Sequence, residues 1–238
     1  MTSSGDEAPV LMCPDRFRPF NNRTDVSVVA RDDRLRVLWC NEAYASTFQS
    51  TPDALRGSSM ESLFTRQFAQ ERAELLGPAI EQSRVLAYDQ VVRGSRYLTR
   101  AWPLDPTAFG TRGCFVVAEP CSTSRPIDQN VPFRSAEIAD LGEFDTLTRR
   151  ELEIFRLLGE GLTGQEIATT LHRSHKTIEF HTARILHALG LRNRTELARL
   201  AAERGLMGFS REAWFRIAHG RGLTPRSRRP EVGAGEAP

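Results

Sequence analysis

Long apolar runs are missing from this sequence of 238 residues. No stretch of 18 apolar residues occurs, so we expect no membrane-spanning helix and no membrane partner. The N-terminus, MTSSGDEAPVLMCPDR, carries acids early and lacks a basic start followed by an apolar run. That pattern excludes a signal peptide, and we therefore expect a cytoplasmic protein.

Cysteine and histidine are too few and too far apart for an ordinary metal site. The cysteines are Cys13, Cys40, Cys114 and Cys121. None forms a C-x-x-C pair and all precede His172, the first histidine, which excludes a zinc site of ordinary spacing. A histidine-ligated haem is likewise excluded from residues 1–171. We interpret the cysteines as small core residues, with a redox sensor as the alternative.

Lysine is almost absent, and the basic side chains are nearly all arginine. Lys176 is the single lysine among 32 basic residues. Residues 1–140 carry 16 arginines and 18 acids, a net charge of −2, whereas residues 141–238 carry 16 basic and 12 acidic side chains, a net charge of +4. This asymmetry favours a nucleic-acid partner for the second part of the chain.

Composition and periodicity divide the chain into two domains. The predicted segments are a mobile start over 1–24, an α+β domain over 25–119, a linker over 120–142, an all-α domain over 143–208, and a short helix with a disordered basic tail over 209–238. Proline recurs in the start and in the linker, which favours irregular structure there. Gly, Pro and Arg dominate after Gly222, a composition typical of disorder.

The first domain is predicted to contain an antiparallel sheet with helices on one side. Its expected strands cover 25–30, 35–40, 85–92, 97–104 and 114–119. Several helices lie between the second and third strands, and Pro78 is expected to kink or split the longest of them. Because strands and helices do not alternate one by one, parallel βαβ units are not favoured.

Helix-start signals recur at short intervals in the second domain. Thr148, Thr163 and Asn193 are each followed three residues later by glutamate, a pair that can form a reciprocal capping box, and Ser174 can cap a fourth start. The expected helices cover 149–160, 164–170, 175–189 and 194–204. Four residues separate the second from the third, which is typical of a helix-turn-helix that places its second helix in the DNA major groove.

The predicted helix over 175–189 has an apolar stripe and a basic outer face. At 100° per residue, Ile178, Thr182, Ile185 and Leu189 share one narrow stripe. The opposite side carries the cations Lys176 and Arg184, the aromatic ring of Phe180 and the small residue Ala183. Side chains of these kinds suit contacts to phosphates and to the edges of bases. The candidate DNA-binding residues, including the borders of the turn, are Thr163, Gln165, Arg173, Ser174, Lys176, Thr177, Glu179, Phe180, His181, Ala183, Arg184 and His187.

The second domain resembles the LuxR-type helix-turn-helix. The resemblance is carried by Leu147-Thr148-Arg149-Arg150-Glu151, Gly161-Leu162-Thr163, Glu166-Ile167-Ala168, Lys176-Thr177-Ile178 and Leu189-Gly190-Leu191. It implies a four-helix DNA-binding domain that acts as a dimer through its last helix, with RNA polymerase as a further partner. Glu179 and Ala188 stand where many members carry a basic residue, which leaves the base preference open.

The first domain resembles a PAS sensor domain, through Asn41-Glu42-Ala43-Tyr44, the helix start Thr51-Pro52-Asp53, and the final strands ending in Phe115-Val116-Val117. Such domains imply a small cavity or a dimerisation surface. The candidate cavity residues are Cys40, Phe48, Phe64, Leu76, Tyr97 and Val117, with ordinary core packing as the alternative for each. Residues 43–62 lack the cysteine needed for a flavin adduct, so we expect no cofactor, while a small-molecule ligand stays open.

These patterns together predict a dimeric, nucleoid-associated transcription regulator that binds double-stranded DNA. No nucleotide-binding glycine loop, catalytic triad or metal constellation indicates an enzyme. One alternative is a sigma-factor-like promoter subunit, although its second basic helical region is replaced here by an acidic, strand-rich domain. The other is a signalling adaptor that does not bind DNA.

Overall fold

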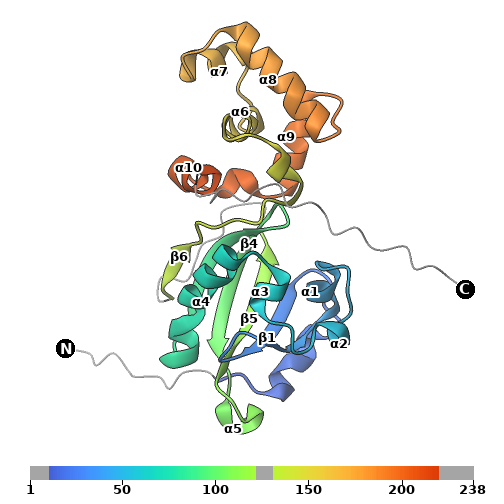
Figure 1. Cartoon of the computed structure of the whole chain (residues 1–238), viewed down its shortest axis with the longest axis vertical. Coiled ribbons are helices and arrows are strands. Elements are labelled where there is room, and N and C mark those ends of the chain that lie inside the picture. Colours follow the sequence, from blue (N-terminus) through green and yellow to red (C-terminus); the bar gives the residue numbers. More distant parts are fainter. Residues whose placement is uncertain (1–10, 122–130, 220–238) are drawn as a thin grey trace, which may run out of the picture.

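The computed structural model describes residues 11–121 and 131–219. A unit built on a β-sheet is followed by a helical unit at one end of that sheet (Figure 1). Parts of the predicted start, linker and disordered tail, at 1–10, 122–130 and 220–238, lie outside the described residues. Within the described ranges, no helix is long and apolar enough to cross a membrane.

The sheet has six strands, one more than predicted. They are β1 (Ser27–Asp32), β2 (Val37–Cys40), β3 (Leu86–Val92), β4 (Ser95–Pro103), β5 (Gly113–Pro120) and β6 (Phe133–Ser135). Their order is β2-β1-β5-β4-β3-β6, and the five predicted strands pair with one another in antiparallel fashion. The sixth, β6, comes from the segment predicted to be a linker and pairs parallel with β3, which makes β6 one edge of the sheet. Three residues are too few to show a strand period, so the sequence does not reveal β6.

Helices cover one face of the sheet. The helices of this unit are α1 (Glu42–Ser46), α2 (Pro52–Leu55), α3 (Met60–Leu63), α4 (Arg66–Glu81) and α5 (Pro106–Phe109). Apolar side chains of the first four pack on that face in a single cluster. The predicted split of α4 does not occur, and Pro78 lies inside the continuous helix. Leu76 and Ala79 are buried on either side of Pro78, which holds this last turn against the sheet.

The N-terminal segment covers the opposite face. A 3₁₀ helix, η1 (Pro14–Phe20), places Phe17 on Phe115 with ring centroids 4.4 Å apart, and Phe17 is buried. Met12 N donates to Pro103 O at 2.9 Å, which ties the segment to the end of β4. The expectation of a mobile start is therefore wrong for residues 11–24. Aromatic side chains of this segment pack into the apolar cluster on this face of the sheet, although its prolines are typical of irregular structure.

The helical unit contains the four predicted helices. Its elements are η2 (Gly142–Thr146), α6 (Arg149–Gly159), α7 (Gly164–Thr170), α8 (His175–Ala188), α9 (Arg194–Glu203), η3 (Leu206–Gly208) and α10 (Arg211–His219). The four predicted N-caps accept the expected backbone hydrogen bonds. The capping box expected at Asn193 does not close, because the Glu196 carboxylate accepts from the backbone and side chain of Arg192 instead.

The last helix, α10, belongs to the core of the helical unit. Trp214 and Ile217 are buried in it, and Trp214 Nε1 donates to Leu152 O at 3.3 Å. Phe209, just before α10, is also buried. The helical unit therefore continues past the boundary predicted at residue 208.

The tip of the β3–β4 hairpin contacts the helical unit. Arg96 N donates to Arg204 O at 2.8 Å, and the Arg96 guanidinium lies 4.7 Å from the centroid of the Phe209 ring. Val91 of β3 joins the same apolar cluster as Leu141, just before η2. The two units therefore share buried contacts as well as a covalent connection.

Candidate nucleic-acid interface and ligand cavity

Helix α8 is fixed to the helical core along one stripe, as predicted. Ile178, Thr182 and Ile185 are buried, and Thr182 Oγ1 donates to Ile178 O at 2.8 Å. The Thr182 hydroxyl is thus satisfied within its own helix, which allows it to lie among apolar side chains. Both α7 and α8 lie on the side of the helical unit away from the sheet, so the outer face of α8 is uncovered (Figure 1).

The twelve candidate DNA-binding residues lie at this uncovered surface. All are exposed except Thr177 and His181, which are half-buried. Phe180 is 60% exposed, and the Arg184 guanidinium lies 5.8 Å from its ring centroid. The ring is thus available to contact a partner beside a positively charged group.

The start of α8 carries a cation, Lys176, that has no ion-pair partner among the described residues. Ser174 Oγ caps the helix by accepting from Thr177 N at 3.1 Å. Lys176 follows in the first turn, is exposed, and forms no ion pair with any residue in 11–121 or 131–219. Because the N-terminus of a helix carries partial positive charge, Lys176 is unfavourable there unless an anion is bound.

Two other candidate residues face α6 as well as solvent. Arg184 Nε lies 3.0 Å from Glu151 Oε1, and His181 Nδ1 lies 3.8 Å from the same oxygen. Burial favours the neutral form of Glu151, but hydrogen bonds from Thr148 and the nearby Arg184 guanidinium outweigh it and lower the pKa of this carboxyl. Arg184 is therefore held by a buried counter-charge while its outer part remains exposed.

Glu179 is neutralised by partners that the sequence did not indicate. Its Oε1 lies 2.5 Å from an Arg194 guanidinium nitrogen and 3.4 Å from His175 Nε2. The chain returns through the α8–α9 loop and brings Arg194 alongside Glu179. The ion pair links the middle of α8 to the first residue of α9.

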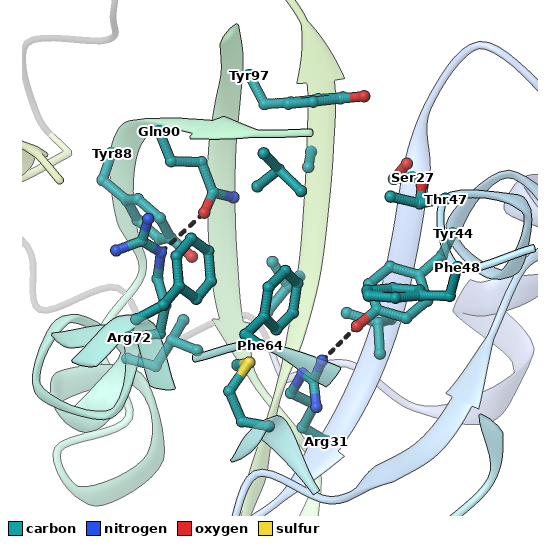
Figure 2. A pocket seen from close by; sticks show the side chains of 17 residues that line it. Ser27, Arg31, Tyr44, Thr47, Phe48, Phe64, Arg72, Tyr88, Gln90 and Tyr97 are labelled. Atoms are coloured by element: carbon teal, nitrogen blue, oxygen red, sulfur yellow. Dashed lines mark hydrogen bonds between the residues drawn. The ribbon is translucent and has the colours of Figure 1, made fainter. Parts of the chain in front are cut away.

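A cavity of about 60 Å³ lies between the sheet and helices α1, α3 and α4 (Figure 2). Four of the six predicted residues line it, namely Phe48, Phe64, Leu76 and Tyr97. Val117 does not, because it alternates with Val116 and Ala118 along β5 and packs on the opposite face of the sheet. Cys40 is buried in the neighbouring apolar cluster but is not part of the cavity wall.

Two buried arginines on the cavity wall were not among the predicted site residues. Arg31 is 2% exposed and Arg72 is 1% exposed. Arg72 shares the buried face of α4 with Phe68 and Leu76, and an arginine on such an apolar stripe is itself a signal. Arg31 follows the strand expected over 25–30 and lies within β1, and nothing in the local pattern indicates its burial.

The buried cysteines have the properties of core residues. Burial raises the pKa of Cys40 to about 11 and that of Cys114 to about 12. Reactivity requires the thiolate, so neither side chain is suited to redox sensing at neutral pH. Among the described residues, no group of three or more potential ligands could hold a metal ion.

Comparisons with known proteins match each unit to a family. The model of bacterial regulatory proteins of the luxR family matches residues 145–201, and the PAS fold model matches residues 20–123. The oxygen regulatory protein NreC of Staphylococcus aureus is 41% identical over 66 residues, which are 28% of this chain. The match spans 30% of that relative's own length.

Solved structures show likeness in both units. VqmA of Vibrio cholerae, in a complex with ligand and DNA, has 17% sequence identity and a TM-score of 0.44, covering 84% of this chain and 91% of that chain. The PAS domain of a LuxR-family transcriptional regulator from Burkholderia thailandensis, in complex with ethanol, has 20% identity and a TM-score of 0.32, covering 43% and 96%. On the family matches, the chain contains a PAS-fold domain at residues 20–123 and a luxR-family helix-turn-helix domain at residues 145–201.

Proposed function

We propose that this protein is a sequence-specific, dimeric regulator of transcription that inserts α8 into the major groove of DNA. The observation that carries the proposal is the outer face of α8. On the second helix of a helix-turn-helix, it presents the exposed ring of Phe180 and the ammonium of Lys176, which forms no ion pair within residues 11–121 and 131–219. An apolar ring suits thymine methyl groups, and an ammonium group suits phosphates.

The ends of the two helices around the turn provide the phosphate contacts in this proposal. Thr163 and Ser174 begin α7 and α8, and both helix N-termini present N–H groups near exposed Gln165 and Arg173. The proposed dimer forms through the exposed side of α9, so that two copies of α8 reach two half-sites. RNA polymerase is the proposed further partner, and the bacterial chromosome is the proposed place of action.

The PAS-fold domain is proposed to modulate DNA binding through the segment 136–141, which we call the connecting segment. Arg72 on the cavity wall donates to Ile138 O at 3.0 Å, and the neighbouring Glu71 carboxylate accepts from Ile138 N at 3.0 Å. The connecting segment ends at Leu141, which is buried in the helical core. A shift of α4 on the cavity wall would therefore move the connecting segment and, through Leu141, the helical unit.

A gel-shift experiment with the full chain and fragments of its own genome tests the proposal. We expect selected fragments to shift in the presence of excess scrambled duplex. The Phe180→Ala variant should shift them more weakly, because it removes exposed surface without disturbing the core. Absence of any shift at low salt would favour the adaptor alternative. The sigma-factor-like alternative would be favoured if the protein binds core RNA polymerase and shifts DNA only when that polymerase is present.

A further inference from the structure

The two buried arginines of the cavity differ in their partners (Figure 2). Arg72 forms an ion pair with Glu71, donates to Gln90 Oε1 at 2.8 Å, and lies 3.9 Å from the Phe68 ring centroid. Arg31 forms no ion pair with any carboxylate in residues 11–121 or 131–219. Its acidic neighbour is occupied elsewhere, since Asp32 binds Arg36 Nε at 3.0 Å.

The Arg31 guanidinium is therefore a buried positive charge with neutral partners. It donates to Leu35 O at 2.6 Å and to the Tyr44 hydroxyl. A guanidinium carries five N–H donors and stays protonated in proteins, so two neutral acceptors neither use all its donors nor balance its charge. Burying such a charge without an anion is unfavourable, which is typical of a site built for a ligand that supplies the anion.

The surroundings of Arg31 define what the anion is attached to. The remaining cavity wall is mostly aromatic and aliphatic, and includes Phe48, Phe64 and Val116. Tyr44 accepts from Arg31 through its oxygen, which leaves its own O–H proton available to donate to the same anion. A volume of about 60 Å³ restricts the occupant to a small molecule.

We propose that the cavity binds a small monocarboxylate with an apolar body. One or both carboxylate oxygens accept from the Arg31 guanidinium and the Tyr44 hydroxyl, and the body lies against Phe48 and Phe64. Planar guanidinium groups match carboxylates well because they can donate two parallel hydrogen bonds. The inference deepens the sensor role proposed for the PAS-fold domain, and its test requires no DNA.

Calorimetric titration of the full chain with acetate and propionate, which suit a cavity of about 60 Å³, tests this assignment without DNA. At least one of the two should bind, whereas the uncharged amides acetamide and propionamide should not. Arg31→Met removes the charge at similar length and should weaken binding by about tenfold or more, since it deletes a charge-assisted hydrogen bond. Arg34→Met removes an exposed charge from the same turn, away from the cavity wall and without disturbing the Asp32–Arg36 pair, and should leave binding unchanged.

The thermal midpoint without ligand separates a ligand-binding role from a structural one. Replacing an uncompensated buried charge by an apolar side chain should leave the midpoint of Arg31→Met unchanged or raise it. If Arg31→Met does not fold, Arg31 has a structural role and the assignment is wrong.

Tyr44→Phe provides a second variant and should weaken carboxylate binding while preserving the ring. The proposal is also overturned if neither carboxylate binds the wild type, if an amide binds equally well, or if Arg31→Met binds as the wild type does. A failed gel shift with successful titration would instead overturn only the DNA-binding proposal.

Discussion

At the residue scale, the first turn of α8 carries an exposed lysine at the helix N-terminus, where the helix dipole disfavours a positive charge. Lys176 lies at the positive end of the helix dipole, and no described side chain compensates its charge. A cation held there in the free protein is ready to contact phosphate. We therefore expect Lys176 to contribute DNA affinity that does not depend on base sequence.

Replacing Lys176 by alanine should lower DNA affinity and reduce the salt dependence. One lost phosphate contact reduces the slope of log affinity against log salt by about one unit. Fluorescence anisotropy of a labelled duplex across a range of salt concentrations measures both quantities. Arg66→Ala, which removes an exposed charge from α4, is the matched control and should behave as the wild type. A Lys176→Ala slope equal to that of the wild type contradicts the phosphate contact.

Glu179 should control discrimination more than affinity. Its carboxylate binds Arg194 and lies beside the outer face of α8, where it can accept from a cytosine amino group. Glu179→Lys should raise affinity for scrambled DNA and reduce the ratio of specific to non-specific binding. Competition binding at fixed salt measures that ratio. Glu61→Lys makes the same charge change on α3, and an equal ratio in both variants would retire the role of Glu179.

At the element scale, a buried carboxylate joins the start of α6 to α8. Glu151 closes the capping box with Thr148 and faces Arg184 and His181 of α8. The same side chain therefore stabilises one helix and sets the position of the other. Because it is buried, its charge is screened little by solvent.

The lowered pKa of Glu151 predicts a dependence of stability on pH. The ionised carboxylate is favoured in the folded state, so its contribution is complete above the ordinary value of 4.5 and is lost as pH falls through the lower folded pKa. Glu151→Gln should reduce the free energy of unfolding at pH 7 by about 1–3 kcal/mol. It should also flatten the loss of stability between neutral pH and pH values below 4.5.

Urea unfolding of the two proteins at several pH values measures both effects. Glu153→Gln, on the same helix but half exposed, should cost about 0–1 kcal/mol at pH 7. If Glu151→Gln and the wild type lose stability in parallel as pH falls, the carboxylate is not the titrating group.

The tip of the β3–β4 hairpin requires glycine for contact between the two units. A Cβ on Gly94 would lie 2.9 Å from Leu141 O and 3.0 Å from the Phe144 ring. Gly94→Ala should therefore lower the thermal midpoint and loosen the contact, measured as faster hydrogen exchange in the connecting segment. Gly57 has a similar positive φ, +80° against +74°, but open space around it. Gly57→Ala should share the backbone strain without the faster exchange, and equal exchange in the two variants would contradict a tight contact.

At the scale of the whole molecule, local signals were predictable from the sequence and distant partners were not. The four N-caps of the helical unit depend on residues three positions apart, and they agree with the structure. The strand β6, the Glu179–Arg194 ion pair and the burial of Arg31 depend on chain segments meeting in space. Four of the six candidate cavity residues line the cavity, but the strand register excludes Val117 from it.

The two units also share a core, which periodicity cannot reveal. Val91 of the sheet, Leu141 of the connecting segment and Trp214 of α10 belong to one buried cluster. A DNA-binding fragment should therefore extend from about residue 141 through α10 rather than end near residue 210. Ending it earlier would expose the surface that α10 covers on α6.

The central claim is that two copies of α8 read the DNA major groove. Hydroxyl-radical footprinting and guanine-methylation interference on a fragment selected by the full chain test it most directly. We expect two protected half-sites related by approximate two-fold symmetry, with centres about 10 bp or a multiple of it apart, and interference from methyl groups in the major groove. A single unpaired half-site at saturating protein, or protection that is insensitive to major-groove methylation, would contradict the account.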